Sequence, residues 1–110
     1  MINVGINGFD AFGCEITTVG HFANEQYDCI NPQETPCPTN NGMNHMHKTC
    51  LAAITEDRKD LHFETFEDVL KTNHLQDKKV FLKIDCEGCE YPGLKYVPIE
   101  QLDHIDQLVG

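Results

Sequence analysis

The chain has 110 residues, with 18 acidic against 8 basic side chains and a formal net charge of -10. A chain of this length forms one small domain around a single hydrophobic core. Because affinity for nucleic acid depends on neutralising phosphates with Lys and Arg, the charge disfavours a nucleic-acid partner.

The first half of the chain predicts two strands and a long loop. Residues 1–4 form a short apolar strand, followed by the turn Gly5-Ile6-Asn7-Gly8, whose glycines permit positive φ angles and close approach to a ligand. The β-branched run at residues 15–19 lies between two glycines and predicts a second strand. From residue 24 to 44 prolines and asparagines accumulate and hydrophobic periodicity disappears. We therefore expect a long irregular loop, which extends over residues 24–48.

The second half predicts strands and helices in alternation. Phe66, Val69 and Leu70 recur at helical spacing after the capping residue Thr65, so a helix is expected over residues 66–73. A second short helix is expected where Pro98 opens residues 98–104. Strands are expected at residues 50–54, 79–84 and 106–109. The run 79–84 is nearly continuously apolar, which is typical of a parallel strand covered on both faces.

This alternation predicts an α/β fold with a mostly parallel sheet, in one domain over residues 1–110. Ligands of such sheets bind beyond the carboxyl ends of the strands. The glycine turn at residues 5–8 and the acidic loop Asp85-Cys86-Glu87-Gly88-Cys89-Glu90 each follow a predicted strand. We therefore expect the two loops to meet at one edge of the sheet and to form a binding site there.

The start of the chain and its cysteines bear on the compartment. Met1 is followed by Ile2-Asn3-Val4-Gly5, not by the basic and apolar regions of a signal peptide, and no apolar run approaches the roughly 20 residues of a membrane span. We therefore expect no membrane span in this chain and a cytoplasmic protein. The alternative is a lumenal or secreted protein that lacks its N-terminal signal here. The six cysteines are Cys14, Cys29, Cys37, Cys50, Cys86 and Cys89. The cysteines are open to three interpretations: a disulfide set, a metal site or small buried residues.

Four side chains close in sequence offer metal ligands, namely Cys37, His45, His47 and Cys50. Their spacing matches no established zinc pattern, and the pair Cys86 and Cys89 lacks a second pair of ligands nearby. We therefore predict no metal site. A small zinc-binding or disulfide-stapled interaction module is kept as an alternative function.

Residues 83–91, Lys-Ile-Asp-Cys-Glu-Gly-Cys-Glu-Tyr, resemble the K-I-D-x-E-G-x-E-aromatic signature of the FkbM-type methyltransferases. The glycine turn is similar to the first glycine motif of that family, and residues 63–70 and 106–109 are similar to the segments that flank the signature. The resemblance covers most of residues 57–110 and the first half in part. It implies a Rossmann-like methyltransferase sheet, S-adenosylmethionine as cofactor, and methyl transfer to an oxygen of a small molecule or glycan.

The same resemblance assigns roles to individual residues. Gly5, Asn7, Gly8 and Asp85 would line the cofactor, and Asp85 would also face the methyl-transfer cleft. A sulfonium donor reacts by in-line displacement, so the protein mainly has to position the donor and the acceptor. Asp85 and Glu87 are the candidate catalytic residues, because carboxylates can hold a cationic donor and take the proton of an acceptor hydroxyl. Family members continue past residues 106–109, so a partial domain is expected, with a sheet that is incomplete at its C-terminal end.

The sequence departs from the family pattern in two places. The family has an acidic residue after its second strand that holds the ribose hydroxyls, whereas Gly20 and His21 follow the predicted strand at residues 15–19. Only residues 6–14 connect the first two predicted strands, which is too short for a parallel crossover. A degenerate, non-catalytic family member is therefore a further alternative.

Overall fold

The computed structural model describes residues 1–6, 10–29, 35–40, 43–84 and 105–109. Its elements in chain order are β1 (Ile2–Val4), α1 (Ala11–Gly20), β2 (Asn24–Tyr27), the 3₁₀ helix η1 (Pro38–Asn40), β3 (Asn44–His47), β4 (Cys50–Leu51), β5 (Glu56–Arg58), β6 (Leu61–Glu64), α2 (Phe66–Thr72), β7 (Val80–Ile84) and β8 (Ile105–Val109). The predicted helix at residues 98–104 lies outside the described part of the chain.

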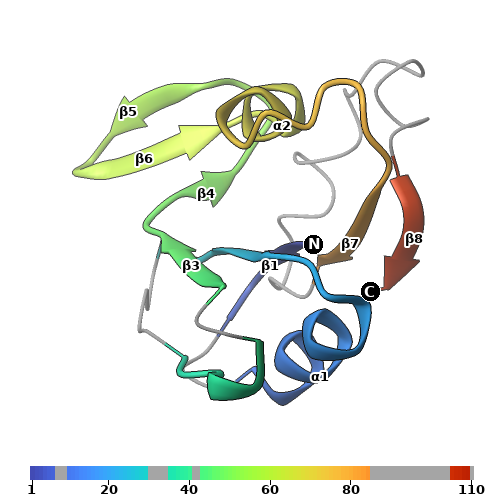
Figure 1. Ribbon diagram of the computed structural model, residues 1–110. Helices are drawn as coiled ribbons and strands as arrows, with labels where there is room; N and C mark the ends of the chain where they lie inside the picture. The colour runs from blue at the N-terminus through green and yellow to red at the C-terminus, as the bar shows by residue number, and fades with distance from the viewer. Residues whose placement is uncertain (7–9, 30–34, 41–42, 85–104, 110) are drawn as a thin grey trace.

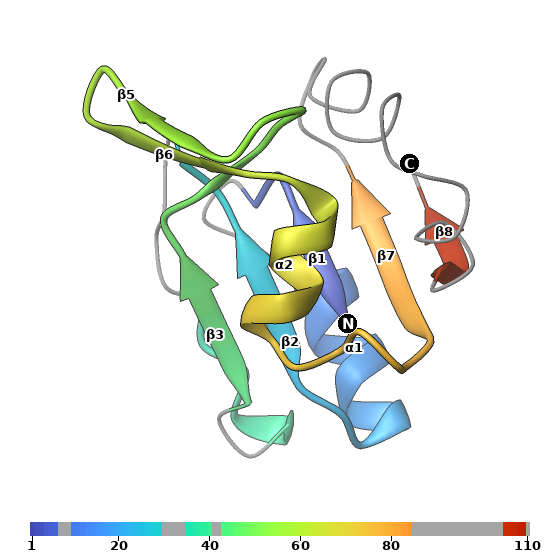
Figure 2. The same ribbon diagram turned by 90° about the horizontal axis from the view of Figure 1, so that it is seen from above.

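The protein is α/β, with a five-stranded sheet in the order β3-β2-β1-β7-β8. Every neighbouring pair in this sheet is parallel, which confirms the predicted sheet type. Helix α2 covers one face of the sheet and α1 the other (Figure 1 and Figure 2). A three-stranded sheet in the order β4-β6-β5 lies beyond the carboxyl ends of β2 and β3 (Figure 2).

The hydrophobic core lies between the five-stranded sheet and α2. Ile2, Val4, Leu82 and other alternate residues of β1 and β7 are buried in one cluster with Phe66 and Leu70 of α2. Each such side chain stabilises the fold by about 1.5–3 kcal/mol when it is fully buried. The predicted helix at residues 66–73 is thereby confirmed, as are the strands predicted at residues 79–84 and 106–109.

The strand predicted at residues 15–19 is wrong, because these residues form the second half of α1. Asp10 caps this helix, and its carboxylate Oδ1 accepts the backbone N–H of Gly13 at 2.9 Å. The hydroxyl of Thr17 donates to the Gly13 carbonyl at 2.6 Å, and that of Thr18 donates to the Cys14 carbonyl at 2.7 Å. The threonine hydroxyls therefore bond within the helix and do not disrupt it.

The long loop predicted at residues 24–48 is also wrong in part, because this range contains β2, η1 and β3. Strand β2 pairs in parallel with β1, and α1 lies within the connection between them. The first crossover therefore has the length and the helix that a parallel pair requires.

Candidate functional site

The parallel strands β1 and β7 are neighbours in the sheet, and the helices that connect them to the rest of the chain lie on opposite faces. Strand β1 leads through α1 to β2 on one side, whereas β7, its neighbour on the other side, is reached from α2 on the opposite face. The strand order reverses between β1 and β7, and in open parallel sheets ligands bind outside the carboxyl ends at such a point. We call the edge where these strands end the carboxyl edge.

Gly5 lies at the carboxyl edge of β1, as the sequence predicted. Its φ of 89° is in the region that other residues rarely adopt, and its N–H donates to the carbonyl of Tyr27 in β2 at 3.0 Å. Val4 and Ile84, the last residues of β1 and β7, are paired in register. The strand that precedes Gly5 and the strand that precedes Asp85 in sequence therefore end side by side. Asn7, Gly8, Asp85 and Glu87 lie outside the described residues, so their predicted roles stay predictions.

Asp28 is a residue at this edge that the sequence reasoning missed. It directly follows Tyr27, the last residue of β2, and its N–H donates to the carbonyl of His47 at the end of β3 at 3.1 Å. Tyr27 is paired in register with Val4, so Asp28 follows β2 where Gly5 follows β1. An acidic residue directly after the second strand was the expected signal, but residues 15–19 had been taken as that strand and they are helical.

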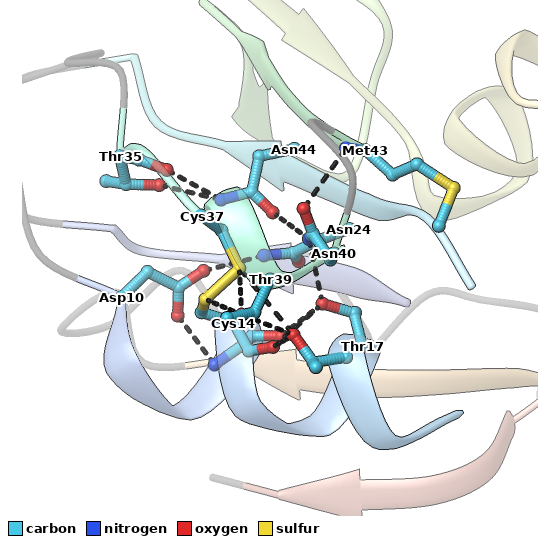
Figure 3. The surroundings of a disulfide bond; sticks show 12 residues. Asp10, Cys14, Thr17, Asn24, Thr35, Cys37, Thr39, Asn40, Met43 and Asn44 are labelled. Atoms are coloured by element: carbon cyan, nitrogen blue, oxygen red, sulfur yellow. Dashed lines mark hydrogen bonds between the residues drawn. A yellow bond between two sulfur atoms is a disulfide. The ribbon is translucent and has the colours of Figure 1, made fainter. Parts of the chain in front are cut away.

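Two disulfides, Cys14–Cys37 and Cys29–Cys50, join segments that are distant in sequence. Cys29 is the residue after Asp28, and its disulfide connects the end of β2 to β4. The other disulfide connects α1 to the residue before η1 (Figure 3). The sequence left the state of the cysteines open, and these four are disulfide-bonded.

The disulfides also correct the zinc-binding alternative. Cys37 and Cys50 were two of its four ligands, and both are bonded to other cysteines. In the part of the chain that the structure describes, no group of three or more His, Cys, Asp or Glu side chains has an arrangement that suits a metal ion. Cys86 and Cys89 lie outside that part.

A cluster of polar side chains lies on β2 and β3, on the side of the sheet that faces α2. The carboxylate of Glu25 contacts His45 Nδ1 and His47 Nε2, each at 2.8 Å. The His47 ring stacks on the Tyr27 ring at 4.5 Å, and Asn73 Nδ2 donates to the Tyr27 hydroxyl at 2.7 Å. Burial raises the pKa of the Tyr27 hydroxyl above its usual range. Tyr27 is therefore neutral and anchors the end of β2 to the residue after α2.

The Glu25 cluster makes folding stability depend on pH. Partial burial raises the pKa of Glu25, but the hydrogen bonds from His47 and His45 outweigh it and hold the pKa below the ordinary value of 4.5. A lowered carboxyl pKa stabilises the fold above the unfolded value, and this contribution is lost as the pH falls below 4.5. We expect Glu25→Gln to lower the free energy of unfolding by about 1 kcal/mol at pH 6 and by less at pH 3.5.

Urea unfolding at the two pH values measures this difference. Glu15→Gln, a change at an exposed site on α1, is the control and should leave the wild-type pH dependence unchanged. Equal losses at pH 6 and pH 3.5 for Glu25→Gln would show that the carboxylate makes no charge-dependent contribution.

Comparison of the chain with protein-family models, with curated proteins and with solved structures finds no match. Among the described residues, no helix combines the length and the apolar character that are needed to cross a membrane. The class that the fold defines is thus an α/β protein with a parallel sheet and a candidate site at its carboxyl edge. The function of the protein depends on the residues of that edge.

Proposed function

We propose that this chain is an S-adenosylmethionine-dependent methyltransferase domain of the FkbM type, with a Rossmann-like sheet. The observation that carries the proposal is the pairing of β1 with β7. The glycine turn begins directly after β1, and the family-like signature at residues 83–91 begins within β7. The two segments that the family uses at its cofactor site therefore leave neighbouring strands at the point where the strand order reverses.

Asp28 supports the same proposal. The family has an acidic residue after its second strand that holds the ribose hydroxyls, and β2 is the second strand of this chain. We propose that Asp28 is the residue in that place. The departure at Gly20 and His21 arises only if residues 15–19 are taken as the second strand. A carboxylate can accept two hydrogen bonds from a ribose diol, one on each oxygen.

The catalytic roles follow from the chemistry of the donor. Asp85 and Glu87 are proposed to hold the sulfonium cofactor and to take the proton of the acceptor, an oxygen of a small molecule or glycan. Asn7 and Gly8 are proposed to line the cofactor together with Gly5. In-line methyl transfer needs little else than alignment of donor and acceptor, which a rigid strand edge can supply.

The experiment that tests the proposal is a calorimetric titration of the 110-residue chain with S-adenosylhomocysteine. We expect saturable binding, and we expect Asp28→Asn to weaken it by about tenfold, because an amide accepts through only one of its two end groups. Asp57→Asn on β5 is the control, because Asp57 is exposed on the other sheet and should leave the affinity unchanged. A wild-type chain without saturable binding would contradict the proposal.

The two disulfides favour a second candidate, a disulfide-stapled interaction module without catalysis. Such a module would need its disulfides to fold but would show no binding in the titration above. For such a module we propose a lumenal or secreted location, because disulfides persist in oxidising compartments.

A further inference from the structure

A layer of polar side chains, centred on Asp10, is buried between the sheet and α1. The Asp10 side chain accepts hydrogen bonds at Oδ2 from Asn3 Nδ2 at 2.9 Å, Asn24 Nδ2 at 2.8 Å and Gln26 Nε2 at 2.7 Å. Its Oδ1 accepts the N–H of Gly13. The three amide residues are at most 1% exposed and Asp10 is 8% exposed. One carboxylate thus connects β1, β2 and α1 (Figure 3 shows its bond to Asn24).

The carboxylate determines how the surrounding amides are oriented. Within the described chain, Asn3 Oδ1, Asn24 Oδ1 and Gln26 Oε1 have no hydrogen-bond donor, whereas each NH₂ group of these side chains points at Asp10. A Cβ placed on Gly13 would lie 2.3 Å from Asp10 Oδ2, so the glycine permits the first turn of α1 to approach the carboxylate. A buried charge that is fully hydrogen-bonded fixes one arrangement of its partners, because leaving it unpaired is costly.

The groups that Asp10 holds are those that flank the candidate site. Asn3 precedes Gly5 by two residues in β1, and Gln26 precedes Asp28 by two residues in β2. Asp10 itself begins the helix that follows the glycine turn. We propose that Asp10 is a positioning residue, whose carboxylate aligns β1, β2 and α1 so that Gly5 and Asp28 are correctly placed for the adenosyl cofactor. The cofactor part of this inference rests on the proposed function.

Asp10→Asn is the most direct test. Asparagine caps helices about as well as aspartate, so the helix start is kept while the charge that orients three amides is lost. We expect hydrogen exchange at the amides of Gly5, Ile6 and Gly13 to become at least about tenfold faster than in the wild type, because the local opening free energy falls. We also expect the dissociation constant for S-adenosylhomocysteine to rise about tenfold.

Val69→Ala is the matched control, because Val69 is buried on the opposite face of the sheet, in the core beneath α2. It lowers global stability without touching the Asp10 layer, so it should leave the affinity unchanged and should not accelerate exchange selectively at these three amides. If Asp10→Asn does not fold, Asn24→Ala removes one donor and is expected to give the same pattern with smaller amplitude.

The two readouts separate this inference from the proposed function. Selective acceleration at Gly5, Ile6 and Gly13 in the Asp10 variant supports positioning, even where the wild-type chain binds no cofactor and the proposed function fails. Exchange that matches the Val69→Ala pattern overturns the inference. Wild-type affinity in a folded Asp10→Asn protein overturns it as well.

Discussion

Replacing Cys29 and Cys50 by serine is expected to lower the free energy of unfolding by about 3 kcal/mol. The two cysteines are 21 residues apart, and a disulfide that closes a loop of this length removes that much conformational entropy from the unfolded chain. The change should also weaken S-adenosylhomocysteine binding by several-fold, because Cys29 fixes the residue next to Asp28. Urea unfolding and calorimetric titration measure the two effects.

The other disulfide provides the control. Replacing Cys14 and Cys37 by serine opens a loop of nearly the same length, with a separation of 23 residues, so we expect a similar loss of stability. Its cysteines are not adjacent to Asp28, and the loss of affinity should therefore be smaller than for the Cys29 and Cys50 change. Equal affinity losses in the two double variants would show that the disulfides act only through overall stability.

The fold class, α2, β7 and β8 were predictable because their hydrophobic patterns are simple, whereas β5 and β6 were not predicted. Phe66, Val69 and Leu70 face the core at helical spacing, and residues 80–84 form an apolar strand. In both cases burial of apolar side chains is the main source of stability, so the pattern of apolar residues indicates the structure.

Helix α1 was not predictable in the same way, because its inner face is polar. Thr17 is buried, and its hydroxyl bonds both within the helix and to Asn40 Nδ2 at 3.1 Å. Four residues of α1, Ile16 to Val19, are β-branched, and local propensity therefore favours a strand. The helix is held by its Asp10 cap and by contacts with residues distant in sequence, which propensity does not include.

Strand β2 was missed for a related reason. Asn24 and Gln26 point into the Asp10 layer, and Glu25 and Tyr27 point to the other side of the sheet. The buried side chains on the Asp10 side are polar, so β2 lacks the alternation of apolar and polar residues that marks a half-buried strand. The site was affected in turn, because the acid that follows β2, Asp28, could be recognised only once β2 was placed. Gly5 was found from sequence, because a glycine directly after an apolar strand is a local signal.

Gly5→Val is expected to abolish measurable S-adenosylhomocysteine binding, with a loss of affinity of at least about 100-fold. The φ of 89° at Gly5 is strained for any other residue, and for a β-branched one it is an outlier. Strain of this kind costs of order 1–3 kcal/mol, so the free energy of unfolding should fall by that amount. The side chain would also occupy the space beyond β1 into which the cofactor is proposed to fit. Calorimetric titration and urea unfolding of the same sample measure both effects.

Gly5→Asn shows whether the glycine is needed for its positive φ angle or for close approach of the cofactor. Asparagine accepts positive φ angles better than other side chains, so this variant should recover most of the stability that valine loses. Its side chain still projects beyond β1, so the affinity should stay low if Gly5 is needed for close approach to the cofactor. If binding returns together with stability, Gly5 serves only the turn between β1 and α1, and the ligand does not contact the backbone there. The N–H of Gly5 already bonds to Tyr27, so in either case the turn holds β1 and β2 together at the carboxyl edge.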